Sequence, residues 1–206
     1  LLGLRSRLRN PFGRLLVLGL VGLQVATIVV TYSRGAVLGL GVGLLTLVLA
    51  AGKNRGRSMA LVGAVALSVG FLAPERFWNR TETIVSYEED ASAMGRIHAW
   101  KTAENIIQRR PLTGIGAAAF TTAWASYAPG EAGPTPYVAH NLFLEVAAEL
   151  GLIALVGLCV LIFSAARGAL LVARIGESGA VPDEAKALFA AIAGYLVCQM
   201  FAGFML

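Results

Sequence analysis

Residues 139–151 have the sequence Ala-His-Asn-Leu-Phe-Leu-Glu-Val-Ala-Ala-Glu-Leu-Gly, and the rest of the chain is organised around this stretch. A polar, proline-containing segment ends just before it, and an apolar run that continues to about residue 166 begins inside it. His140 therefore lies where a loop becomes a hydrophobic helix. A helix N-terminus carries about half a positive charge, which favours a neutral imidazole and can hold an anion nearby.

Long apolar runs dominate the composition. Of the 206 residues, 57% are hydrophobic and 14% are charged, whereas an ordinary soluble domain has about 25% charged residues. We therefore predict an all-α, polytopic membrane helix bundle with about five transmembrane helices and a long, partly helical periplasmic loop. The predicted spans are residues 15–32, 35–51, 58–73, 141–166 and a run from about 185. A signal peptide is the alternative for the first span, but residues 31–34 are a poor cleavage site.

The charges of the short connections predict the orientation. The arginine-rich arm at residues 1–14, the hairpin at 52–57 and the segment 167–174 fall on one side of five spans, which the positive-inside rule makes cytoplasmic. The long segment 75–139 carries six Lys or Arg and seven acidic residues and falls on the other side. In a bacterium this is the periplasmic face of the inner membrane. The net charge of +5 is thus a topology signal, and we expect no nucleic-acid partner.

Three regions follow from this topology. Residues 1–74 form a basic cytoplasmic arm and three spans, residues 75–140 a periplasmic loop with short helices, and residues 141–206 two further spans. We expect the chain to be the C-terminal half of a longer multi-span protein, because it begins with Leu and ends inside an apolar run. Cys159 and Cys198 lie in apolar runs, so we interpret them as packing residues and expect no disulfide and no metal site.

Within the long loop, helical spacing of apolar residues predicts a helix over residues 94–108, with Ser92 as a possible N-cap. A second short helix is predicted over residues 117–127, with a turn at Gly114-Ile115-Gly116 between them. Residues 85–92 and 128–137 are expected to be irregular. The loop aromatics are candidates for the membrane interface, where aromatic rings are favoured; they include Trp100, Phe120, Trp124 and Tyr127.

Three side chains on the outer side are candidates for chemistry. Arg34 separates two apolar runs, where it either anchors a span in lipid headgroups or pairs with phosphate. Arg96 lies in the first turn of the predicted loop helix, where a cation opposes the helix dipole; it is an exposed charge, a salt-bridge partner or an anion ligand. His140 is either a hydrogen-bonded interfacial histidine or a general base.

Two carboxylates follow His140 in the fourth predicted span. Glu145 lies in its first turn, and Glu149 lies one turn further along. A carboxylate at that depth is costly unless it is paired or solvated, and helical geometry points both away from His140. We expect them to pair with another helix or to line a polar cavity. The second histidine, His98, lies within the predicted loop helix and is interpreted as a surface or packing residue.

Four motifs follow one another along the chain: Ser33-Arg34-Gly35 between two spans, Gly95-Arg96 with Trp100 in the long loop, residues 111–116 (Pro-Leu-Thr-Gly-Ile-Gly), and His140-Asn141 followed after nine residues by Gly151. In the order and spacing of these motifs the chain resembles the O-antigen ligase and polymerase superfamily of membrane glycosyltransferases. Ala154 departs from the pattern, since ligases often have Gly, Thr or Tyr at that position. The subtype within the superfamily is therefore left open.

The resemblance implies transfer of a glycan from an undecaprenyl diphosphate carrier at the periplasmic face, without a metal ion, nucleotide or other cofactor. The acceptor is lipid A core in ligases, another carrier-linked glycan in polymerases and a protein serine in other relatives. By analogy Arg34 and Arg96 bind the diphosphate, with Ser33 and Asn141 beside the substrate, and His140 orients or deprotonates the acceptor hydroxyl. A solute transporter with Glu145 and Glu149 along its path is the alternative of another class, and a non-catalytic assembly partner is a third.

Overall fold

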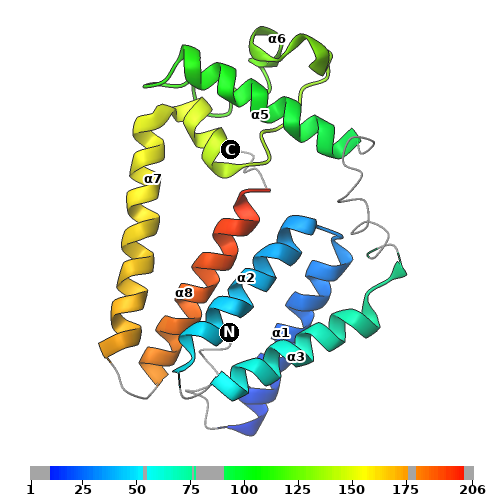
Figure 1. Ribbon diagram of the computed structural model, residues 1–206, viewed down its shortest axis with the longest axis vertical. Helices are drawn as coiled ribbons and strands as arrows, with labels where there is room; N and C mark the ends of the chain where they lie inside the picture. The colour runs from blue at the N-terminus through cyan, green and yellow to red at the C-terminus, as the bar shows by residue number, and fades with distance from the viewer. Residues whose placement is uncertain (1–9, 53–54, 76, 78–90, 176–179, 202–206) are drawn as a thin grey trace. The chain divides into compact units, whose positions relative to one another are not determined.

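A computed structural model of the chain describes residues 10–52, 55–75, 77, 91–175 and 180–201. Within these residues every secondary-structure element is helical and no strand occurs, so the all-α prediction is confirmed there. Residues 1–9 of the basic arm predicted over 1–14, and residues 85–90 of the irregular segment predicted over 85–92, lie outside the described part. Figure 1 shows the helices, which are α1 (Pro11–Val30), α2 (Arg34–Ala50), α3 (Arg55–Leu72), α5 (Ala91–Arg109), α6 (Trp124–Tyr127), α7 (Leu142–Ile175) and α8 (Ala180–Gln199), with a 3₁₀ helix, η4 (Gly130–Ala132), between α6 and α7.

Helices occupy all five regions that were predicted to span the membrane, but the five-span topology is confirmed only in part. Pro11–Val30 and Leu142–Arg174 are long and apolar enough to cross a bilayer, and Gly35–Ala50 is apolar but shorter. α3 and α8 are not among the described helices that combine this length with this apolarity. The count of about five spans and the periplasmic position of the loop therefore stay predictions.

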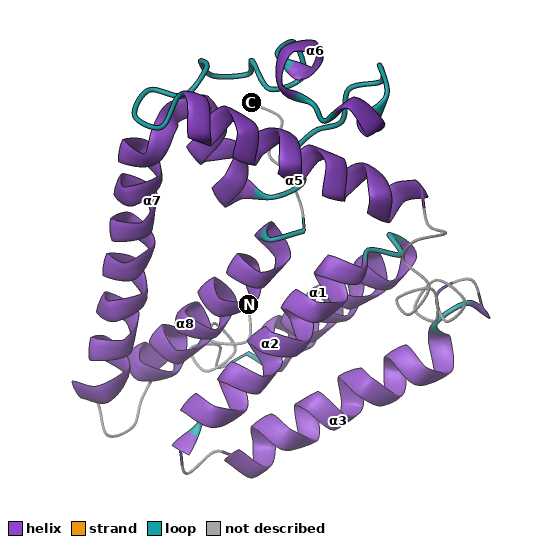
Figure 2. Cartoon of the chain, turned by 45° about the horizontal axis from the view of Figure 1, so that its top comes forward, coloured by secondary structure: helices purple, strands orange, loops and turns teal. Residues whose placement is uncertain are grey.

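The chain divides into two compact units, which are described separately. Leu1–Thr81 and Phe163–Cys198 form the first, here called the bundle unit, and Glu82–Ile162 and Gln199–Leu206 form the second, here called the loop unit. In the bundle unit α1, α2 and α3 pack against one another (Figure 2). The starts of α1 and α2 are encoded locally, because Asn10 and Ser33 accept the N–H groups of Phe12 (3.0 Å) and Ala36 (3.3 Å) as N-caps.

Small residues bring α2 against α8 within the bundle unit. A Cβ atom on Gly39 would lie 2.6 Å from the carbonyl oxygen of Gly194, and one on Gly43 would lie 3.3 Å from that of Ala190. Backbones at this distance leave no room for a side chain, which is the usual reason for glycine at four-residue spacing in packed apolar helices. Gly39 and Gly43 are therefore packing residues of α2.

We expect the Gly39→Ala variant to lose about 1–3 kcal/mol of unfolding free energy, because the added methyl group overpacks the contact between α2 and α8. Gly41 is the matched control: it lies on the same helix, and a Cβ there would meet nothing within 4 Å. Gly41→Ala should leave stability unchanged or raise it slightly, since alanine favours helix. The midpoint of thermal unfolding in detergent checks both variants, and equal midpoints would contradict the packing argument.

The core of the loop unit joins α5 to the segments on either side of α6 and to the start of α7. Seven residues that are at most 3% exposed form it: Ala99, Ala103, Ile106, Phe120, Trp124, Ala139 and Ala148. Three of them recur on one face of α5, at helical spacing. The assignment of Phe120 and Trp124 to the membrane interface was wrong, because both rings are buried in this core.

Two boundaries in the loop unit differ from those predicted. α5 begins at Ala91 rather than at 94, so Ser92 lies within the helix instead of capping it, and Arg96 lies in the second turn instead of the first. Of the helix predicted over 117–127 only α6 (Trp124–Tyr127) forms, preceded by turns. The positive backbone φ angle of Ala118 (58°) is incompatible with a right-handed helix that starts at residue 117.

α7 is broken at Gly151, where the backbone (φ 85°, ψ 171°) is not helical. Figure 1 shows the first turns of α7 at a sharp angle to the rest. The helix before the break contributes Ala148 to the core of the loop unit, whereas the helix beyond the break presents apolar side chains outward, with Ile153 68% and Leu161 71% exposed. The run from 141, predicted as one continuous helix, is therefore two helical segments that meet at Gly151.

Residues 111–116 cap both helix ends at this break. The N–H groups of Ile115 and Gly116 donate to the carbonyl oxygens of Ala148 (3.1 Å) and Glu149 (2.8 Å), and the N–H of Leu152 donates to the carbonyl oxygen of Pro111 (2.8 Å). Helix ends leave such groups unsatisfied, and in an apolar setting each would be costly. Two of the sequence motifs, residues 111–116 and Gly151, thus form one structural joint.

Candidate functional site

His140 is the residue immediately before Asn141, the N-cap of α7. Its backbone has φ 49°, in the left-handed region that few residues other than glycine adopt. The side chain is half-buried. Backbone strain of this kind costs about 1–3 kcal/mol and persists where the surroundings hold it, often at functional sites.

Arg96, on the second turn of α5, lies close enough to His140 to act on it electrostatically. Burial lowers the pKa of His140 below its usual value of 6.5, and the positive charge of Arg96 lowers that pKa further. The imidazole is therefore neutral at pH 7. A neutral imidazole beside a fixed cation can accept a proton while the cation binds an anion.

The motif that contains Arg96 holds α5 against the segment leading to His140. The indole N–H of Trp100 donates to the carbonyl oxygen of Ala139 at 3.0 Å. Gly95 lies under the ring of Tyr137, where a Cβ would be 2.6 Å from the ring carbon Cε1. Gly95, Arg96 and Trp100 therefore all face residues 137–140, which explains their spacing along the helix.

Asn141 is the N-cap of α7. Its side-chain oxygen Oδ1 accepts the N–H groups of Phe143 (3.0 Å) and Leu144 (3.2 Å). The sequence predicted a place for Asn141 beside the substrate, and the structure gives this oxygen a role in starting the helix.

Replacing Asn141 by alanine should cost about 1 kcal/mol of unfolding free energy, the usual cost of losing an N-cap. Asn141→Asp should keep wild-type stability, because a carboxylate accepts the same two N–H groups and complements the helix dipole. Thermal unfolding in detergent measures both variants, and an Asp variant as unstable as the Ala variant would contradict the capping role.

The other predicted site residues belong to the bundle unit. Ser33 is the N-cap of α2 and uses its hydroxyl oxygen to accept the N–H of Ala36, and Arg34 is the first residue of that helix. The structure therefore brings together Arg96 and His140 in one unit and Ser33 and Arg34 in the other.

The two carboxylates of α7 are buried, with Glu145 5% and Glu149 2% exposed. Glu149 accepts the backbone N–H of Ala118 on Oε2 (2.8 Å) and that of Phe120 on Oε1 (2.9 Å). Its partner is thus a loop backbone, neither of the two environments expected from the sequence. Among the described residues no cluster of three His, Cys, Asp or Glu side chains has a geometry that could hold a metal ion.

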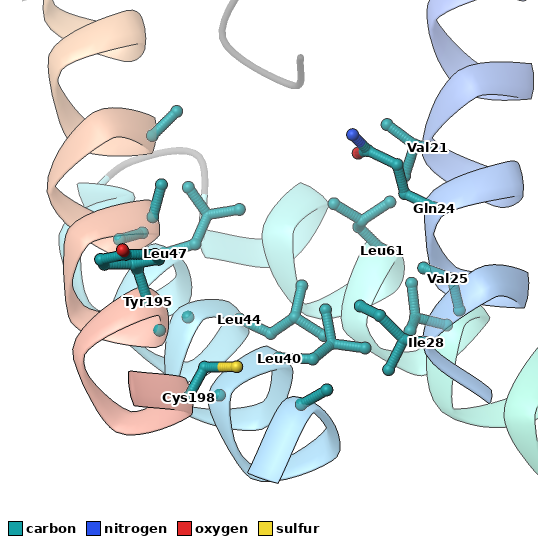
Figure 3. Close-up of a pocket in the computed structure, with 18 residues that line it drawn as sticks. Val21, Gln24, Val25, Ile28, Leu40, Leu44, Leu47, Leu61, Tyr195 and Cys198 are labelled. Carbon is teal, nitrogen blue, oxygen red and sulfur yellow. The ribbon is translucent and has the colours of Figure 1, made fainter. Parts of the chain in front are cut away.

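A cavity of about 440 Å³ lies within the bundle unit and contains none of the predicted site residues. Figure 3 shows its walls, where leucine side chains of α2 and α3 face Gln24 of α1 and Tyr195 of α8. Its lining is almost wholly apolar, which suits hydrocarbon and does not suit a diphosphate. We therefore assign the candidate site to the polar residues around His140.

The sequence did not reveal the joint at Gly151 or the hydrogen bonds from the N–H groups of Ala118 and Phe120 to the carboxylate of Glu149. A signal for the joint was present, since Gly114, Gly116 and Gly151 all belong to the recognised motifs and all have positive φ angles. A Cβ on Gly114 would overlap the backbone of Glu149, and one on Gly151 would overlap the carbonyl group of Leu112. These glycines mark two segments that approach each other closely.

Fold and site together define a helical protein with membrane-length apolar helices and an arginine–histidine pair in its loop unit. Residues 19–159, more than half of the chain, match the O-antigen ligase family. The chain belongs to this family of membrane proteins, which confirms the resemblance seen in its motifs. No curated protein and no solved structure matches the chain.

Proposed function

We propose that the protein transfers a glycan from an undecaprenyl diphosphate carrier to an acceptor hydroxyl, without a metal ion, at the periplasmic face of the bacterial inner membrane. Lipid A core or a similar lipid is the proposed acceptor. Membership of the O-antigen ligase family supports glycan transfer. The observation that carries the mechanism is the contact of Gly95 and Trp100 with residues 137–139, which holds the helix of Arg96 against the half-buried His140. The charge of Arg96 and burial both lower the pKa of that histidine.

In the proposed reaction the imidazole of His140 takes the proton of the acceptor hydroxyl. The acceptor oxygen then attacks the anomeric carbon while the bond from that carbon to the diphosphate oxygen breaks, so the anomeric centre is inverted. The diphosphate leaves with the bonding electrons, and Arg96 and Arg34 neutralise its growing charge. Fixed cations placed where charge develops can supply this stabilisation in the absence of a metal.

A carrier-linked glycan or a protein serine could replace lipid A core as acceptor, since the same groups would activate any hydroxyl. The O-antigen polymerase and protein O-oligosaccharyltransferase activities are therefore alternatives within the family. Solute transport has less support, because both carboxylate oxygens of Glu149 accept backbone N–H groups and its side chain is 2% exposed.

Complementation of a deletion strain with the full-length protein tests the proposal. Arg96→Ala and Arg34→Ala are expected to lower surface glycan by about 10²- to 10³-fold, the usual loss when one charge-stabilising group is removed. Arg167→Ala, a charge on α7 far along the chain from the motifs, is the control and should complement fully. Normal surface glycan with both arginine variants present in the membrane would refute the proposed mechanism.

The pH dependence of transfer gives an independent check. Because the pKa of His140 is lowered from 6.5, the base is neutral at pH 7, and transfer should fall only as pH drops below 6.5. Removing the charge in Arg96→Gln should raise the pKa of His140 and move this acid limb to higher pH in the residual activity. A wild-type acid limb centred above pH 6.5, or a limb that does not move in Arg96→Gln, would contradict this assignment.

A further inference from the structure

Glu149 alone accepts hydrogen bonds from three alternate residues of one loop. Its carbonyl oxygen accepts the N–H of Gly116 (2.8 Å), and its two carboxylate oxygens accept those of Ala118 (2.8 Å) and Phe120 (2.9 Å). Both carboxylate oxygens are used, and hydrogen bonds to an ionised carboxylate are stronger than those between neutral groups. Residues 116–120 are therefore fastened to the last turn of α7 before its break.

One residue of this loop has an unfavourable backbone conformation. Ala118 has φ 58°, a left-handed conformation that is unfavourable for alanine. The hydrogen bond from its N–H to Glu149 Oε2 compensates for that strain. The carboxylate thus selects one loop conformation over the relaxed ones.

Phe120 connects the loop to the candidate site through the core of the loop unit. Its ring is 3% exposed and lies in the core with Ala99 and Ala103 of α5 and with Ala139. α5 carries Arg96, and Ala139 precedes His140 and accepts the Trp100 indole N–H. Movement of Phe120 would therefore disturb the packing on which the distance between Arg96 and His140 depends, because close-packed cores transmit such shifts.

We propose that Glu149 is a positioning residue for glycan transfer: its carboxylate clamps residues 118 and 120 and, through Phe120, holds α5 and the residues before His140 in their working arrangement. This role rests on the proposed function of the site. Glu149 contacts backbone groups of the loop and acts on the reaction only through them. It therefore differs from Arg96 and His140, which are proposed to meet the substrate.

Glu149→Gln in the full-length protein tests the clamp, since its amide NH₂ would face a backbone N–H in place of one acceptor. Two quantities are measured: amide hydrogen exchange of residues 116–120 in detergent, and transfer kinetics with undecaprenyl diphosphate-linked glycan extracted from a deletion strain. We expect faster exchange, a fall of about 10- to 100-fold in kcat and little change in KM, because a displaced catalytic pair loses rate more than binding. Exposed Glu104 on α5 supplies the control, and Glu104→Gln should match wild type in both measurements.

Glu149→Asp covers the case in which the Gln variant does not fold. It keeps the charge but is one methylene shorter, so a smaller effect in the same direction is expected, with partial recovery of kcat relative to Gln. Unchanged exchange at 116–120 would overturn the clamp, and faster exchange with wild-type kcat would overturn the positioning role. In that second case an inactive His140→Ala variant would leave the proposed function standing, whereas a fully active one would remove both.

Discussion

His140→Ala is expected to lower glycan transfer by about 10²- to 10⁴-fold, the usual contribution of a general base. The variant removes the group proposed to accept the acceptor's proton and leaves the neighbouring cation of Arg96 in place. Donor binding should persist for the same reason, so the loss should appear in the rate and hardly in KM. Transfer by the full-length protein in membranes, with the carrier-linked donor varied in concentration, measures both quantities.

His98 provides the matched control for this experiment. It is the second of the chain's two histidines, and it lies half-buried on α5, two residues after Arg96. His98→Ala should transfer glycan at a rate close to wild type. If the two histidine variants behaved alike, with equal amounts of protein in the membrane, His140 would lose its proposed catalytic role.

Gly151→Ala should destabilise the protein by about 2–6 kcal/mol. About 1–3 kcal/mol of this comes from forcing alanine into a backbone conformation that only glycine commonly adopts. A similar amount comes from overpacking, since a Cβ on Gly151 would overlap the carbonyl group of Leu112 and lie 2.8 Å from the nitrogen of Thr113. The yield of monodisperse protein in detergent and the midpoint of its thermal unfolding are the measurements.

A second glycine of the same helix separates this effect from a general intolerance of substitution. Gly157 lies beyond the break, and a Cβ there would meet nothing within 4 Å. Gly157→Ala should be as stable as wild type or slightly more stable, because alanine favours helix over glycine. Should Gly151→Ala unfold at the same temperature as Gly157→Ala, the joint at residue 151 would not have the energetic importance assigned to it.

Hydropathy located the helices well but could not show where α7 is broken. An apolar run from Leu142 onward looks continuous, and a glycine inside a helix costs only about 1 kcal/mol relative to alanine. What ends the first segment at Gly151 is a set of hydrogen bonds to residues 111–116, which are distant in sequence. Every residue of that loop except proline has a backbone N–H group, so composition alone cannot indicate which of them meets α7.

The sequence predicted those parts of the candidate site that depend on the type of side chain at a position. The sequence pointed to Arg96 and His140, and the structure places them close enough for the charge of Arg96 to lower the pKa of His140. Helical geometry also predicted that Glu149 is not a direct partner of His140. In the structure the carboxylate of Glu149 accepts backbone N–H groups of the loop instead. The backbone partners of Glu149 and the capping by Asn141 were missed, because they depend on how two loops meet the start of α7.

The joint between residues 111–116 and Gly151 also constrains how the protein is made. Synthesis proceeds from the N-terminus, so α5 and the loop after it leave the ribosome before α7 exists. Their acceptors on Ala148 and Glu149 follow 33 residues later in the sequence, and their donor on Leu152 follows 41 residues after Pro111. The loop unit can therefore close only after the start of α7 has been synthesised. The candidate site is in this way completed late in synthesis, once the first turns of α7 have emerged.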